Sequence, residues 1–194
     1  ISIIIPIRNE VEKIRFAIKS CLNQKKIDMK QIEIIIADGN STDGTSEILK
    51  LLSKENKCIK IVFNKYRYMP HGFNKALSIA TGEYIMLMSG HSIIGEDYLF
   101  NCLEVMSKRT SECVSGVMDT IQDNHLGRVI GVAQSTLFGV GSVAFRTKIT
   151  GGRYVDTGVF GFYKAKIFLE IGGMDEELIK NQDDELNYRC VANG

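Results

Sequence analysis

An unbroken run of large apolar residues is the feature that most constrains the fold of this chain. Residues 34–37 read Ile-Ile-Ile-Ala and stop at Asp38, which opens a polar, glycine-containing turn that continues to Thr45. Because no polar residue alternates with the isoleucines, both faces of this strand are expected to be buried, as they are in a parallel sheet. Open α/β sheets bind ligands outside the carboxyl ends of their strands. The run therefore predicts a parallel sheet with Asp38 at the edge where a binding site would lie.

The remainder of the first half alternates between strand and helix patterns. Apolar runs predict strands over residues 2–7, 32–37, 59–63 and 83–88, and apolar residues at helical spacing predict helices over 10–22, 46–52 and 71–80. Thr42 or Asp43 is expected to cap the second helix, because each has a side-chain oxygen that can accept from a free backbone N–H. This alternation predicts an α/β fold with a doubly wound, mostly parallel sheet flanked by helices.

The second half has a less regular pattern. It predicts a helix over 98–107, strands over 113–118 and 154–163, a helix over 164–171, and a last helix that begins at Gln182 and is capped by Asn181, whereas the glycine-punctuated region 127–146 is left unassigned. No Ser-rich or charged linker divides the chain, so we expect one domain over residues 1–194. The chain begins without methionine inside a strand and ends soon after a helix starts, so we expect it to be part of a longer protein.

Composition narrows the classes of function. The 24 Lys and Arg residues are matched by 23 Asp and Glu residues, so overall charge does not favour a nucleic-acid partner or an acidic membrane surface. The five cysteines are scattered, which favours buried free thiols in a reducing compartment over a metal-binding knuckle. No stretch approaches the roughly 20 apolar residues that cross a bilayer. We therefore expect this part of the protein to be soluble.

Polar groups gather where predicted strands end and where the last helix begins. They are Arg8-Asn9-Glu10, Asp38 to Asp43, Ser89-Gly90-His91, and the acidic turn Asp183 to Glu185. Five stretches follow the order of motifs in a known family: residues 2–10, 37–45, 74–88 with Gly82-Glu83-Tyr84, 172–176 and 181–189. The chain resembles the family 2 glycosyltransferases of the nucleotide-sugar-binding GT-A fold, and in particular bacterial exopolysaccharide glucosyltransferases of the succinoglycan-biosynthesis type. The resemblance covers essentially the whole chain.

The resemblance implies an enzyme that moves a sugar from a UDP-sugar to a hydroxyl group with inversion at the anomeric carbon. It implies a nucleotide-binding half over residues 1–95 and an acceptor-binding half over residues 96–194. The acceptor would be a saccharide or a lipid-linked saccharide at the cytoplasmic face of the inner membrane, in surface polysaccharide biosynthesis, with any membrane segments lying beyond this chain. The residues name neither the sugar, the acceptor nor the oligomeric state.

The nucleotide-sugar site implied by the resemblance comprises seven residues: Pro6, Arg8, Glu10, Asp38, Asn74, Ser89 and Gly90. The carboxylate of Asp38 can accept the imide N–H of uracil, which cytosine lacks at the same position. The alternative is that Asp38 only stabilises its own turn by accepting nearby backbone N–H groups. Glu10 has a similar alternative, because an acidic residue at the start of a helix is favoured by the helix dipole.

Three positions depart from the family's pattern. Gly39 stands where many relatives have a second acid, and Ser89 and His91 replace two acids that meet the ribose and a bridging Mg²⁺ or Mn²⁺. A serine can still bond a ribose hydroxyl, and an imidazole suits Mn²⁺ better than Mg²⁺. His91 is therefore a candidate metal ligand. The alternative is a polar turn residue in an enzyme that has lost tight metal binding.

The acidic turn of the last helix supplies the candidate catalytic residues, Asp183 and Asp184. By register, Asp183 matches the family's general base, which takes the proton of the acceptor hydroxyl. Neighbouring carboxylates raise one another's pKa, which helps a base to hold that proton. One base suffices, so Asp184 or Glu185 is expected to be partly structural, since acids also stabilise helix starts.

Two other functions fit parts of this pattern. A catalytically silent nucleotide-sugar-binding domain would keep the nucleotide contacts and lack turnover. The replacement of two acids by Ser89 and His91 is compatible with such a domain. A nucleotidyltransferase would need a glycine-rich phosphate loop after the first strand, and residues 6–10 contain no glycine.

Overall fold

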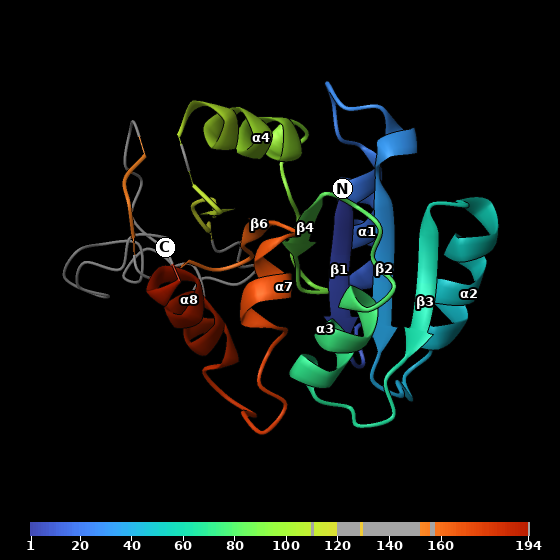
Figure 1. Ribbon diagram of the computed structural model, residues 1–194. Coiled ribbons are helices and arrows are strands. Elements are labelled where there is room, and N and C mark those ends of the chain that lie inside the picture. The colour runs from blue at the N-terminus through green and yellow to red at the C-terminus, as the bar shows by residue number, and fades with distance from the viewer. Residues whose placement is uncertain (110, 120–128, 130–151, 156–157, 194) are drawn as a thin grey trace.

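Six strands form one sheet in the order β3-β2-β1-β4-β6-β5 (Figure 1), in a computed structural model that describes residues 1–109, 111–119, 129, 152–155 and 158–193. The strands are β1 (Ser2–Ile7), β2 (Glu33–Asp38), β3 (Ile59–Phe63), β4 (Tyr84–Leu87), β5 (Cys113–Val114) and β6 (Phe162–Lys164). β1 to β4 run parallel, whereas β6 runs antiparallel to β4 and β5. The mostly parallel sheet expected from the sequence is confirmed.

Helices cover both faces of this sheet, which makes it doubly wound. On one face lie α1 (Ile14–Leu22), α2 (Thr45–Glu55) and α4 (Tyr98–Lys108), and on the other lie α3 (Met69–Leu77), α7 (Ile167–Ile171) and α8 (Gln182–Ala192). A short 3-10 helix, η1 (Met29–Gln31), precedes β2. Successive isoleucines of β1 point to opposite cores: Ile3 packs with the first group of helices and Ile4 with the second. Burial on both faces is the physical reason for the unbroken apolar runs.

The strands of the second half are shorter than the sequence pattern predicted. The strand expected over 154–163 is wrong for most of its length, because Tyr154 and Val155 are outside the sheet and β6 covers only Phe162–Lys164. The strand expected over 113–118 is also shorter. Only two of its residues, those of β5, pair with the short strand β6. The region 127–146 lies outside the described residues, apart from Val129.

The ends of three helices also differ from expectation. The helix expected from residue 10 begins at Ile14, after a turn in which the Glu10 carbonyl accepts from two backbone N–H groups. Gly44 is the residue before α2, and the Asp43 side chain stabilises that start by accepting from the N–H of Thr45 at 3.0 Å. Asn181 makes no side-chain cap, because it precedes α8 in a left-handed conformation with φ of 59°. The prediction of an Asn181 cap was therefore wrong.

The described cysteine side chains carry no disulfide. Cys21 and Cys102 are buried, as predicted, whereas Cys58, Cys113 and Cys190 are partly exposed. Burial raises the pKa of the Cys21 thiol to about 12, so this thiol is unreactive near neutral pH. Among the described helices, none combines the length and the apolar character needed to cross a membrane.

Candidate active site

The carboxyl ends of β1 and β4 separate where the strand order reverses. β1 pairs with β2 from Ser2 to Ile7 but with β4 only from Ser2 to Ile4. Pro6 lies beyond that point and has no N–H with which to continue a ladder. Such a switch point is where open α/β sheets bind ligands. Arg8 is exposed directly after β1, so Pro6 and Arg8 both lie at the expected binding edge.

Side-chain hydrogen bonds join the loop after β1 to the loop after β2. Four bonds of 2.9–3.0 Å connect them: Asn9 N–H to Ser41 Oγ, Thr42 N–H to Asn9 Oδ1, Glu10 N–H to Thr45 Oγ1, and Val11 N–H to Asp43 Oδ2. Asp43 therefore binds both its own helix start and the neighbouring loop, and these contacts lower the pKa of its carboxyl group. The two loops form one connected unit at the edge of the sheet.

Asp38 is buried at the end of β2, with 6% of its surface exposed. Its Oδ1 accepts from the N–H of Ser41 at 3.0 Å and from the Ser41 hydroxyl at 2.6 Å, and its Oδ2 accepts from the Ser46 hydroxyl. Turn stabilisation, the alternative role considered from the sequence, is therefore what the hydrogen bonds provide. A uracil contact would have to use the remaining acceptor capacity of Oδ2, and it stays a prediction.

The glycine after Asp38 has a steric explanation. A Cβ atom on Gly39 would lie 3.1 Å from the carbonyl oxygen of Ile7 and 3.2 Å from that of Arg67. The Gly39 N–H also donates to the Ile7 carbonyl at 2.8 Å, so its backbone is held against the end of β1. This close backbone approach leaves little room for a side chain at this position.

The turn after β4 meets the loop after β1 through a pair of side chains. His91 Nδ1 lies 2.7 Å from Glu10 Oε1. Between them, a Cβ atom on Gly90 would lie 2.6 Å from Ile7 Cγ2 and 3.0 Å from Glu10 Cγ, so only glycine fits there. Ser89 shares a 2.6 Å hydroxyl contact with Ser92. The structure thus brings together Glu10, Gly90 and His91, which lie far apart in the sequence.

Asn74 makes hydrogen bonds to the segment before α8 that the sequence did not suggest. Its Nδ2 donates to the Met174 carbonyl at 2.8 Å and to Glu176 Oε1 at 3.0 Å, and its Oδ1 accepts from the Met174 N–H at 2.8 Å. In addition, His71 Nε2 lies 3.5 Å from Glu176 Oε2. Both amide hydrogens of Asn74 are therefore used to hold α3 against the segment that leads to α8, and a nucleotide contact by Asn74 stays a prediction.

Asp183 lies in the first turn of α8, and its Oδ1 is buried with no hydrogen-bond partner among the residues that the structure describes. Burial raises the pKa of its carboxyl group, and the neighbouring charge of Asp184 raises it further. Gln182 places this turn beside the start of α3, because its Nε2 lies 3.9 Å from Met69 Sδ. A partly buried carboxylate with spare acceptor capacity and a raised pKa is suited to accept a proton.

Glu185, the third acid of this turn, has a structural role. Its two oxygens accept from Arg189 at 2.5 and 2.6 Å, and Arg189 also donates to the carbonyls of Ile171 and Gly173. The arginine thereby fixes the segment before α8 to the helix itself. The expectation that not all three acids serve catalysis agrees with this arrangement.

Several residues that shape the site had no role assigned from the sequence. Asn9 and Thr45 join the two loops, and Gln182 and His71 each have a buried polar atom, Oε1 and Nδ1, with no partner within the described ranges. Their contacts link segments more than 30 residues apart in the chain, so no local pattern could reveal them. Only the polar character of residues 9 and 45 beside strand ends gave a signal.

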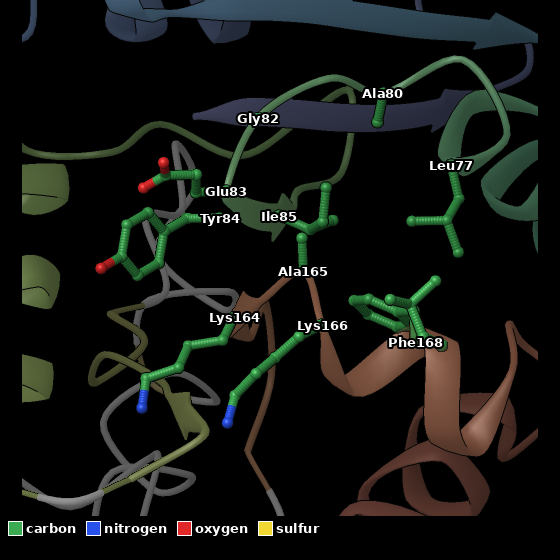
Figure 2. A pocket seen from close by; sticks show the side chains of 11 residues that line it. Leu77, Ala80, Gly82, Glu83, Tyr84, Ile85, Lys164, Ala165, Lys166 and Phe168 are labelled. Carbon is green, nitrogen blue, oxygen red and sulfur yellow. The ribbon is translucent and has the colours of Figure 1, made fainter.

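A pocket of about 600 Å³ lies at the opposite end of β4, away from the predicted site residues. Figure 2 shows Leu77 and Phe168 on one side of it, with Lys164 and Lys166 extending together on the other. Both lysine ammonium groups lie 3.2 Å from Glu112 Oε1. This pocket is mainly apolar, and its lysines share a carboxylate partner.

The described residues of the site supply only part of a coordination shell for a divalent cation. The oxygens of a bound diphosphate would have to complete that shell. No three His, Cys, Asp or Glu side chains in the described ranges lie close enough together to hold a metal. Since Glu10 occupies Nδ1 of His91, Nε2 is the nitrogen that remains for a ligand role. Sites for nucleotide-bound Mg²⁺ take few protein ligands and complete the shell with phosphate oxygens. A single imidazole nitrogen fits that role.

Solved structures share this architecture at low sequence identity. Staphylococcus aureus TarS 1–349 in complex with UDP superimposes with a TM-score of 0.72 and 20% identity, over 96% of this chain and 53% of that one. The Pyrobaculum calidifontis mannosyltransferase PcManGT in complex with GDP-Man and Mn²⁺ gives a TM-score of 0.71 and 20% identity, over 96% of this chain and 50% of that one. The domain therefore has the GT-A fold of glycosyltransferases, as expected.

The chain belongs to glycosyl transferase family 2, which it matches over residues 2–172. Among curated relatives, a dolichyl N-acetyl-alpha-D-glucosaminyl phosphate 3-beta-D-2,3-diacetamido-2,3-dideoxy-beta-D-glucuronosyltransferase of Methanococcus voltae is 31% identical over 202 residues. Succinoglycan biosynthesis protein ExoA of Rhizobium meliloti is 28% identical over 194 residues. These matches cover 100% and 99% of this chain but 62% and 58% of the relatives. The resemblance to the family is thus confirmed, and the chain spans less than two thirds of either relative.

Proposed function

We propose that this domain transfers a sugar from a UDP-sugar to a hydroxyl group of a saccharide or lipid-linked acceptor, with inversion at the anomeric carbon. The observation that carries the proposal is the buried Oδ1 of Asp183, which accepts no hydrogen bond from the described part of the chain and belongs to a carboxyl group of raised pKa. In the reaction, the acceptor oxygen bonds to the anomeric carbon from the side opposite UDP. The bond from that carbon to the diphosphate breaks, UDP leaves with the bonding electrons, and Asp183 takes the hydroxyl proton.

The donor would lie at the switch point between β1 and β4. In this proposal Asp38 faces the base, Ser89 bonds the ribose, and Pro6 and Arg8 border the nucleotide. The exposed guanidinium of Arg8 is suited to an anionic group. The TarS complex with UDP supports a uridine nucleotide, because it contains that ligand on the same fold.

His91, through Nε2, is the residue that would hold a divalent cation, with the donor's phosphate oxygens as the other ligands. The cation would stabilise negative charge on the leaving diphosphate. The Mn²⁺ in the PcManGT complex supports this choice of metal, and an imidazole ligand favours Mn²⁺ over Mg²⁺.

The acceptor half and the cellular location are also proposals. The name of the Methanococcus voltae relative includes a dolichyl-linked sugar phosphate, and ExoA is named for succinoglycan biosynthesis. These names support a lipid-linked or saccharide acceptor in polysaccharide biosynthesis. The location proposed with it is the cytoplasmic face of a membrane. In this proposal residues 1–95 bind the nucleotide and residues 96–194 bind the acceptor, although strands of both parts share one sheet.

Thermal-shift measurements with UDP-, GDP- and dTDP-sugars, each with and without Mn²⁺, test donor binding. We expect stabilisation by UDP-sugars and a larger shift when Mn²⁺ is present. Turnover is tested by NMR of the product's anomeric linkage after incubation with a UDP-sugar and saccharide acceptors. A retained anomeric configuration would refute the mechanism. Binding of UDP-sugar with no hydrolysis or transfer would support the catalytically silent domain, the second candidate, which the replacement of two acids by Ser89 and His91 favours.

A further inference from the structure

Glu10 and His91 form a side-chain pair that bridges the two loops at the switch point. The distance between Glu10 Oε1 and His91 Nδ1 is 2.7 Å, and 20% of the Glu10 side chain and 54% of the His91 side chain are exposed. The pair joins residues that are 81 positions apart. His91 therefore has one ring nitrogen occupied, while about half of its side chain is exposed to solvent.

The position of Glu10 is fixed from several sides. Its backbone N–H donates to Thr45 Oγ1 at 2.9 Å, and the next N–H, that of Val11, donates to Asp43 Oδ2 at 3.0 Å. The carbon chain of Glu10 lies against the α-carbon of Gly90, where a Cβ atom would be only 3.0 Å from Glu10 Cγ. Glu10 is thus held by the loop after β2 and by the turn that carries His91.

This contact determines which nitrogen of a neutral His91 ring carries the hydrogen. A carboxylate only accepts hydrogen bonds, so the hydrogen must lie on Nδ1 and the lone pair on Nε2. We propose that Glu10 is a positioning residue: it fixes the Nδ1–H tautomer of His91 and keeps Nε2 available as the ligand for the cation that binds with the donor diphosphate. A carboxylate behind a ligating histidine orients the ring and strengthens it as a ligand.

Glu10 would supply, through His91, the negative charge that the family's second acid brings to the cation. The family's second acid would supply a negatively charged oxygen directly, whereas here the negative charge stands one group further away, on Glu10, and acts through the imidazole. The cation-binding part of the inference rests on the proposed function. The tautomer does not, because it follows from the contact between the two side chains alone.

The tautomer can be measured by NMR on the protein with ¹⁵N-labelled histidine. The chain has three histidines, and the His91 signals are identified by their loss in His91→Gln. At a pH where imidazole is neutral, we expect His91 in wild type to show hydrogen on Nδ1. In Glu10→Met, which keeps the carbon chain but removes the acceptor, we expect the hydrogen to move mainly to Nε2. Glu12→Met is the matched control, because Glu12 is an exposed acid two residues away, and it should leave the tautomer unchanged.

Cation binding is measured separately by electron paramagnetic resonance of Mn²⁺ titrated into the protein with saturating UDP. Glu10→Met should weaken Mn²⁺ binding about tenfold or more, as loss of such a partner does in other metal sites, and Glu12→Met should not. In a His91→Asp background, the Glu10→Met substitution should no longer weaken binding.

The NMR and Mn²⁺-binding results bear differently on the Glu10 contact and on the proposed function. Hydrogen on Nε2 in wild type overturns the inference without any variant, and so does Mn²⁺ binding that is equal in wild type and folded Glu10→Met. Absence of UDP binding to wild type refutes the proposed function together with the cation-binding part of the inference, whereas an Nδ1–H tautomer in the same sample still supports the Glu10 contact.

Discussion

Asp183→Asn removes the acid that the structure makes most suited to proton transfer, and it changes little else. Asparagine has the same shape as aspartate but cannot accept a proton at neutral pH. General-base catalysis contributes about 10²–10⁴-fold to a rate, equivalent to about 2.7–5.4 kcal/mol of the activation barrier. We therefore expect turnover to fall by about 10²–10⁴-fold, while the Kd for UDP changes little, because the proposed function puts Asp183 on the acceptor side.

The same substitution should leave the fold as stable as before, or slightly more stable. Burial and the like charge of Asp184 both penalise the ionised form of Asp183. Asparagine keeps a polar atom at this position but carries no charge, so these two penalties disappear, whereas an acid in a first helix turn contributes about 0.3–1 kcal/mol that the variant loses. We therefore expect Tm to be unchanged or to rise by at most about 2–4 °C, the shift that 1 kcal/mol produces in a chain of this size.

The stability gain should depend on pH in a defined direction. The pKa of Asp183 is raised in the folded state, so the folded state binds the proton more tightly than the unfolded state does. Ionisation therefore costs the wild type stability as the pH rises through the range from 3.8, the ordinary value, to the raised pKa. The gain of Asp183→Asn should be full above this range and absent below it.

Coupled UDP-release kinetics and thermal unfolding from pH 3 to 8 measure both effects on the same samples. Glu47→Gln is the control, because Glu47 is an exposed acid in the first turn of α2. It should lose a few tenths of a kcal/mol at most and keep its turnover. A variant Asp183→Asn with near-wild-type turnover and lower Tm would refute the reasoning, since that result is expected of an acid that only stabilises a helix start.

Three further substitutions test other contacts. Asp184→Asn removes one of the causes of the raised pKa of Asp183, so the acidic limb of the rate profile should move to lower pH, as kcat/KM measured against pH will show. Arg189→Met leaves two backbone carbonyls and a carboxylate without their donor, so urea unfolding should show a free energy of unfolding lower by about 1.5–3 kcal/mol. An unchanged unfolding midpoint would show that the Arg189 hydrogen bonds do not stabilise the fold. Gly90→Ala forces a methyl group against Ile7 and Glu10, so calorimetry should show weaker UDP binding with Mn²⁺, and equal affinity would contradict the close packing.

The central sheet was predictable because its signal is local. Isoleucines at 3–5 and 34–36 are buried on both faces, and that burial produces apolar runs which the sequence displays directly. β6 gives no such signal, because three residues are too few to show a period and its partners lie almost 80 and 50 residues earlier in the chain. The Asn181 cap failed because residue type alone does not determine φ at a helix start.

The sequence predicted at which edge of the sheet the candidate site lies and which acidic residues it contains. It did not predict the contacts that these side chains make. The sequence placed Glu10, Asp38 and His91 at strand ends correctly, since parallel strands end at a common edge. It could not show that Glu10 binds His91 or that Asn74 binds the Met174 backbone, because these pairs are separated by 81 and 100 residues. Such contacts depend on strand order, which no local pattern encodes.

The joined loops after β1 and β2 have a consequence for how this domain can be altered. Asn9 and Glu10 rely on Ser41, Thr42 and Thr45 for hydrogen-bond partners, and the reverse also holds. A loop grafted alone from a relative would leave backbone groups of its neighbour unpaired, each at a cost of about 1–3 kcal/mol where it is buried. Segments 8–11 and 39–45 are therefore the smallest exchangeable module, and donor preference should be transferable between homologues only when both segments are moved together.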